Sequence, residues 1–115
     1  MNANISNALR YRIYRRDGFR CALCDSTSGL QIHHVLPRGR GGNGSEYNLI
    51  TLCRFCHAIA HGRPLDPTEF TADDINEAAY EYLADYYAED ETFRDVWASI
   101  FLGEDLIGLP PEDPP

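Results

Sequence analysis

The sequence lacks lysine: all ten basic residues are arginine, against 18 acidic residues. It also lacks any apolar run near the roughly 18 residues that a membrane span requires. The opening stretch MNANISNALRYRIYRR contains no apolar core of signal-peptide length. These absences argue against membrane insertion and secretion, so we expect a cytoplasmic protein without a membrane partner. Its four cysteines are then expected to be free or metal-bound thiols.

The missing lysine has two explanations of equal weight. An acid-rich, lysine-free surface suits very high salt, where carboxylates keep a protein hydrated, which fits a halophilic archaeon or its virus. A GC-rich genome that favours arginine codons fits as well. A melting temperature that does not rise with molar KCl would contradict the halophilic origin.

Charge divides the chain into two unlike parts. Residues 1–63 carry nine arginines against three acids, a balance of +6, whereas residues 64–115 carry one arginine against fifteen acids, a balance of −14. The net charge of −8 conceals this division. The first part is suited to meet phosphate groups, and the second is expected to be an acidic extension.

Hydrophobic periodicity and turn residues predict a small α+β fold. Residues 6–17 are typical of a short helix capped by Ser6, residues 30–37 and 48–52 of strands, and residues 53–62 of a helix closed by glycine. Two acidic helices are expected after residue 71, beginning at a Thr71-x-x-Asp74 cap and near residue 91. We therefore expect a core domain over 1–63, a helical extension packed on it over 64–109, and a disordered tail over 110–115.

The cysteines form two C-x-x-C pairs, at Cys21 and Cys24 and at Cys53 and Cys56. Two such pairs have the spacing that grips one tetrahedral zinc ion from both sides. A pair of disulfides or a redox dithiol is the alternative, which the expected compartment and the duplicated motif disfavour. Four thiolates leave no open coordination position, so the predicted zinc ion is structural.

All four histidines lie between residues 30 and 62. His57 and His61 are four residues apart on a predicted helix and project from one face. His33 and His34 are adjacent on a predicted strand and point to opposite faces. One strand histidine can therefore join the helical pair at a metal, while its neighbour is free to act as a base. The alternative is an incidental pair on a solvated helix face.

These segments resemble the HNH endonucleases, whose fold is the ββα-metal (His-Me finger) core. The resemblance covers residues 15–62 and is carried, in the family's order, by RRDGFRCALC, LQIHHVLPRGRGG, NLITLC and CRFCHAIAH. The expected fold is thus a ββα-metal core with the zinc knuckles and the N-terminal helix predicted above. The acidic helical extension has no counterpart in the resemblance.

The resemblance also implies roles for five residues. His34, Asn48 and His57 occupy the three positions that name the family. His34 is implied to be the general base that takes a proton from water, and Asn48 to hold the loop and orient the His34 ring. His57 is implied to bind the catalytic divalent metal, together with His33 and His61.

Elementary chemistry agrees with this division of labour. A neutral imidazole accepts a proton near pH 7, and three neutral ligands leave a cation its full charge for phosphate. Imidazole ligands favour Zn²⁺, Ni²⁺, Co²⁺ or Mn²⁺ over Mg²⁺, which related proteins with an aspartate ligand use more readily. The expected cofactors are thus one structural zinc ion and one catalytic divalent ion of these five.

The expected activity is hydrolysis of DNA phosphodiester bonds, and the alternative is a zinc-stabilised DNA-binding module without catalysis. We expect double-stranded DNA to be bound with low sequence specificity, because no segment resembles a base-reading helix. Acidic runs are usually solvated faces, although the extension could instead mimic nucleic acid. The candidate nucleic-acid contacts are the arginines beside the first cysteine pair and in the glycine-rich loop, namely Arg15, Arg16, Arg20, Arg38 and Arg40.

Overall fold

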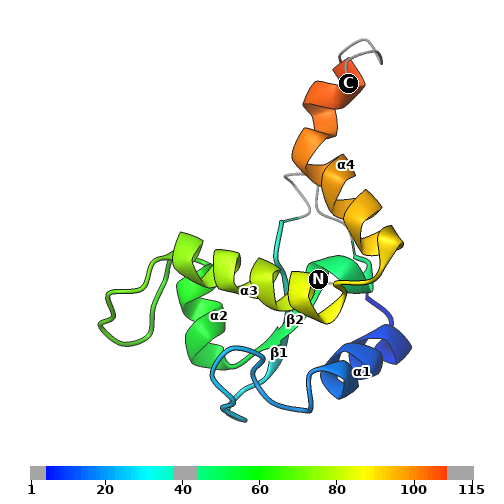
Figure 1. Cartoon of the computed structure of the whole chain (residues 1–115). Coiled ribbons are helices and arrows are strands. Elements are labelled where there is room, and N and C mark those ends of the chain that lie inside the picture. The colour runs from blue at the N-terminus through cyan, green and yellow to red at the C-terminus, as the bar shows by residue number, and fades with distance from the viewer. Residues whose placement is uncertain (1–4, 38–43, 109–115) are drawn as a thin grey trace.

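The computed structural model describes residues 5–37 and 44–108, with residues 100–108 described as helix backbone only. Within this part of the chain, two short strands and a helix follow one another, and two longer helices come after them (Figure 1). The fold is a small α+β arrangement, as predicted. The elements are α1 (Asn7–Arg16), β1 (Gln31–His34), the 3₁₀-helix η2 (Glu46–Asn48), β2 (Leu49–Leu52), α2 (Arg54–Ala60), α3 (Ala72–Tyr86) and α4 (Glu91–Gly108).

The strands β1 and β2 pair antiparallel, and every residue of β2 is buried. Leu49 packs with Ile13 of α1, whereas Ile50 and Leu52 belong to a cluster that includes residues of α3. Successive side chains of a strand point to opposite faces, so both faces of β2 are covered by helices. This arrangement explains why a strand of a two-stranded sheet is wholly apolar apart from one threonine.

The acidic extension contributes to the core through one stripe of each helix. Ile75, Ala79 and Leu83 of α3 are buried, as are Phe93 and Trp97 of α4. The Trp97 indole Nε1–H also donates a hydrogen bond to the carbonyl oxygen of a residue in η2 at 2.7 Å. The buried apolar side chains of both helices therefore pack in the same cluster as β2.

Several element ends follow the predicted capping residues. The Ser6 hydroxyl accepts from the backbone of α1, and Thr71 and Asp74 form a reciprocal capping box on α3. Some boundaries differ from the prediction: β1 ends at His34 instead of residue 37, Asn48 lies in η2 rather than in a strand, and α2 ends at Ala60. The predicted tail over 110–115 lies outside the described residues.

A buried ion pair joins α1 to the sheet and to α3. The Arg16 guanidinium donates to both carboxylate oxygens of Asp17, at 2.7 and 2.9 Å, and to the Leu49 carbonyl at 2.7 Å. Asp17 also accepts from the Thr51 backbone N–H at 2.9 Å and from the Tyr82 hydroxyl at 3.0 Å. A buried charge requires this degree of pairing.

This ion pair corrects one expectation. We predicted that Arg16 contacts nucleic acid, but only 6% of its side chain is exposed and its guanidinium is committed to Asp17 and to backbone carbonyls. The sequence pattern RRDG did not distinguish a surface arginine from one that turns inward to the following carboxylate. Arg16 is a structural residue.

Among the described helices, none combines the length and apolarity that crossing a membrane requires.

Candidate metal centres

Helix α2 carries side chains of two separate clusters of potential metal ligands. Cys53 is its N-cap and Cys56 lies in its first turn, while His57 and His61 follow on the next turn and at its end. The first cluster comprises Cys21, Cys24, Cys53 and Cys56, and the second comprises His33, His57 and His61. In each cluster the ligand atoms lie within 4.8 Å of one another.

The four cysteines have the geometry of a tetrahedral metal site. The Sγ atom of Cys24 is 3.6 Å from that of Cys53 and 3.8 Å from that of Cys56. Zinc–sulfur bonds of about 2.3 Å place neighbouring sulfurs of a tetrahedron about 3.8 Å apart, whereas disulfide sulfurs are about 2.05 Å apart. All four thiols are free of disulfides. The cluster supports the predicted structural zinc site and not the alternative of disulfides.

Negative charges on the thiolates of this cluster repel one another. Burial raises the pKa of Cys56, and the neighbouring thiolates of Cys21, Cys53 and Cys24 raise it further. Four sulfurs this close cannot all carry a negative charge without a compensating cation. A bound zinc ion provides that compensation and would join the loop after α1 to the start of α2.

The three histidine rings of the second cluster meet edge to face. Their ring centroids are 4.6 Å apart for His57 and His61, and 5.1 Å apart from His33 to each of the other two. The Nε2 atoms of His57 and His61 are 3.1 Å apart. Three neutral nitrogen donors at this separation fit one divalent transition-metal ion and leave further coordination positions for water or substrate.

The environment keeps two of these rings unprotonated at neutral pH. The pKa of His33 is lowered to about 4, chiefly because the ring is buried. The hydrogen bond to Asn76 partly opposes this shift, and the charges of the other three histidines add to it. Burial and then the charge of His61 lower the pKa of His57 to about 4. A neutral imidazole is the form that binds a metal, so the site needs no deprotonation step near pH 7.

Two amide side chains contact the outer nitrogens of these rings. Asn76 Oδ1 is 2.7 Å from His33 Nε2, and Gln31 Oε1 contacts His57 Nδ1. Metal-binding histidines commonly donate their second ring N–H to such an oxygen. Sequence reasoning missed both amides. Gln31 lies two residues before His33 and so on the same strand face, but no sequence signal places Asn76 of α3 there.

His34 lies at the last position of β1, half-buried. It lines a small pocket of about 280 Å³ together with His33, His57 and His61. The pocket includes residues from both faces of β1, so it wraps around the edge of that strand. A proton acceptor and the candidate metal ligands thus border the same space.

Asn48 is fully buried and ties η2 to the end of β1. Its Oδ1 accepts from the Leu36 backbone N–H at 2.8 Å, and its Nδ2 donates to the Leu36 carbonyl at 3.0 Å. The Asn48 carbonyl also accepts from Val35 N–H at 2.9 Å. These bonds hold the chain one to two residues beyond His34. Orientation of the His34 ring itself by Asn48 stays a prediction.

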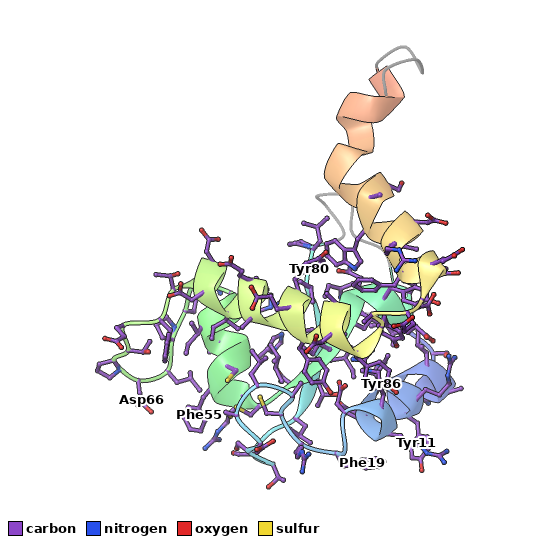
Figure 2. All side chains as sticks on the ribbon, viewed as in Figure 1. Tyr11, Phe19, Phe55, Asp66, Tyr80 and Tyr86 are labelled. Atoms are coloured by element: carbon purple, nitrogen blue, oxygen red, sulfur yellow. The ribbon has the colours of Figure 1, made fainter. Side chains whose placement is uncertain are left out.

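The remaining candidate nucleic-acid contacts are only partly described. Arg15 and Arg20 are exposed, and Arg20 forms an exposed ion pair with Asp25 at 3.3 Å. Tyr11 of α1 and Phe19, which follows that helix, are exposed aromatic residues labelled in Figure 2, and their ring centroids are 5.7 Å apart. Arg38 and Arg40 lie outside the described residues.

Comparison with known proteins agrees with the site geometry. The family model of the HNH endonuclease matches residues 21–63, the segment that contains both clusters. Anaredoxin of the cyanobacterium Nostoc sp. is 33% identical over 46 residues, which are 39% of this chain and 60% of Anaredoxin. The match therefore spans less than two thirds of that relative. No solved structure matches the chain significantly. Residues 21–63 thus match the HNH endonuclease domain, and they contain the four clustered cysteines.

Proposed function

We propose that the protein is a metal-dependent HNH endonuclease that hydrolyses DNA phosphodiester bonds on a ββα-metal core. The observation that carries this proposal is the convergence of three histidine rings, with a fourth histidine on the same pocket, inside the segment that matches the family. A module that only binds DNA needs the four cysteines for its fold, but gains nothing from this second cluster. The order β1, β2, α2 supports the ββα assignment.

His33, His57 and His61 would hold the catalytic divalent ion. That ion, when bound, supplies positive charge that stabilises the phosphoryl oxygens and the leaving oxygen. The chain's part is to present three neutral nitrogens from a strand and a helix at fixed separation. Burial of His33 and its contact with Asn76 support this role, because they fix a ring that water would otherwise solvate.

His34 acts as the general base in this proposal. Its ring borders the pocket that the metal ligands line, and there it would take a proton from a bound water molecule. The ring takes the proton as the water oxygen attacks phosphorus, and the bond from phosphorus to the leaving oxygen breaks. Asn48 supports this geometry by holding the backbone just after His34 through two side-chain hydrogen bonds.

Contact with DNA is assigned to exposed arginines of the basic part. Arg15 and Arg20 are the described candidates, and Arg38 and Arg40 complete the proposed set. Guanidinium groups bind phosphate oxygens in a bidentate manner, without regard to base sequence. The proposed substrate is therefore double-stranded DNA, which the protein would recognise with low sequence specificity.

Plasmid cleavage by the His34→Ala variant tests the proposal. Cleavage is measured after removal of loosely bound metal and separate resupply of Mg²⁺, Mn²⁺, Ni²⁺, Co²⁺ and Zn²⁺. We expect wild-type protein to cut with at least one ion, and the variant to be about 10²- to 10⁴-fold slower because a general base contributes that much.

The control is the variant's metal content and its affinity for a DNA duplex, both of which should equal those of the wild type. Equal cleavage by variant and wild type would contradict the role of His34. Duplex binding without cleavage under any metal would favour the zinc-stabilised DNA-binding module instead.

A further inference from the structure

We propose that Asn76 of α3 is a positioning residue for the histidine metal site. It fixes the ring orientation and the proton position of His33, so the acidic extension completes a site whose ligands all come from residues 21–63. The inference rests on the proposed metal site, but not on nuclease activity.

The orientation of the Asn76 amide is determined by backbone carbonyls. Its Nδ2 donates to the Ala60 carbonyl at 3.1 Å and to the Ala72 carbonyl at 3.0 Å. A carbonyl oxygen only accepts, so the amino group must face these two groups and Oδ1 must face the other way. Oδ1 lies 2.7 Å from His33 Nε2. An exchange of the amide's ends would lose both bonds to carbonyls and set Oδ1 against two other acceptors, so this orientation is the favoured one.

This fixed amide decides which nitrogen of His33 carries the proton. Because Oδ1 is an acceptor, Nε2 must be protonated and donate to it. In the neutral ring, Nδ1 then keeps its lone pair for a metal. His33 is only 4% exposed, so solvent competes little with this hydrogen bond. The contact thus presets a ligand before any metal arrives.

Asn76 is itself held in place by contacts within α3 and by a hydrogen bond to α2. It follows the buried Ile75, and α3 begins at the Thr71 and Asp74 capping box one turn earlier. Its bond to Ala60 joins α3 to the last residue of α2, the helix that carries His57. One amide therefore connects the strand ligand, the ligand-bearing helix and the acidic extension.

The first test is the tautomer of His33 in the full chain with zinc in the four-cysteine site only. Ring ¹⁵N chemical shifts at pH 7.5 separate protonated from unprotonated nitrogens, and a His33→Gln variant assigns the signals. We expect protonated Nε2 in the wild type and loss of this preference in Asn76→Leu, which matches asparagine in size but offers no acceptor. A wild-type His33 protonated at Nδ1 would overturn the proposal.

The second test is affinity for added Ni²⁺, measured by calorimetry on the same zinc-containing proteins. Asn76→Leu should bind the ion about 10- to 100-fold more weakly, the usual cost of removing a partner of a ligating histidine. Asn76→Asp, which keeps an acceptor oxygen but loses both donated bonds, should recover most of the affinity. Equal weakening in Asn76→Asp and Asn76→Leu would assign Asn76 a structural role and overturn the proposal.

A matched variant separates positioning from simple loosening of α3. Tyr82→Phe removes the hydrogen bond from α3 to Asp17, away from the histidines, and should leave Ni²⁺ affinity and the His33 tautomer unchanged. A Tyr82→Phe variant with Ni²⁺ affinity as weak as that of Asn76→Leu would contradict the inference. The His33 tautomer and the Ni²⁺ affinity are both independent of DNA cleavage. If both results are as expected but the protein does not cut DNA, only the proposed nuclease activity is refuted.

Discussion

The four-cysteine cluster and the three-histidine cluster share helix α2 but differ in completeness. The first offers four sulfurs, enough to surround a tetrahedral ion, and two of its members are fully buried. The second offers three nitrogens beside a pocket of about 280 Å³ that a fourth histidine also lines. Adjacent turns of one helix thus carry a closed site suited to folding and an open site suited to chemistry.

The two clusters also differ in how much of the chain they depend on. The four cysteines come from two short segments whose spacing is visible in the sequence. The histidines are held by outer amides, one of which, Asn76, lies in the acidic extension. A closed site is specified mainly by its ligands, whereas an open site also needs neighbours that keep its ligands in place.

The largest effect is expected for Cys53→Ser, which removes one thiol from the closed site. Structural zinc contributes about 10 kcal/mol or more, which is comparable to the whole stability of a small domain, about 5–15 kcal/mol. We therefore expect loss of zinc and loss of the cooperative thermal transition, measured by metal analysis and circular dichroism.

The matched control is Arg54→Ala, because Arg54 is the next residue of α2 and its side chain is exposed. This variant should retain zinc and unfold cooperatively. A Cys53→Ser protein that melts like the control would show that the closed site does not support the fold.

An intermediate effect is expected for His57→Ala, which removes one ligand from the open site. Affinity for the second metal should fall by more than about 100-fold, the upper end of the effect of losing an outer partner. DNA cleavage should fall with it. Zinc content and the melting temperature should stay near wild-type values, since His57 is not part of the closed site. Loss of zinc in this variant would mean that the two clusters are not independent.

The smallest effect is expected for Gln31→Leu, which removes the outer partner of His57. Gln31 is exposed, so water can replace its oxygen, and metal affinity should fall by about tenfold or less. Calorimetry with Ni²⁺ measures this change. A loss larger than that caused by Asn76→Leu would contradict the view that the half-buried Asn76 amide is more important than the exposed Gln31 amide.

The sequence predicted most of what short-range patterns encode. The caps at Ser6 and Thr71, the helix with its cysteine and histidine pairs, and the two strands all depend on neighbours within a few residues. The spacing of the cysteines and of His57 and His61 likewise determined their grouping. Local chemistry was enough for these features.

Long-range contacts set the limits of that prediction. Nothing near Arg16 in the sequence reveals that β2 and α3 close over it, so its charge suggested a DNA contact. Asn76 was missed for the same reason, because 43 residues separate it from His33. The net positive charge of residues 1–63 does not tell which arginines are exposed, because that depends on how the chain packs.

The most direct test of the two-site account is mild chelation of the 115-residue chain, with metal content, circular dichroism and plasmid cleavage followed together. We predict two metal ions per chain at the start. Chelation should remove one ion and stop cleavage while the zinc ion and the fold remain, and a divalent ion should restore cutting. Cleavage that persists after the second ion is gone, or unfolding that accompanies its loss, would contradict the account.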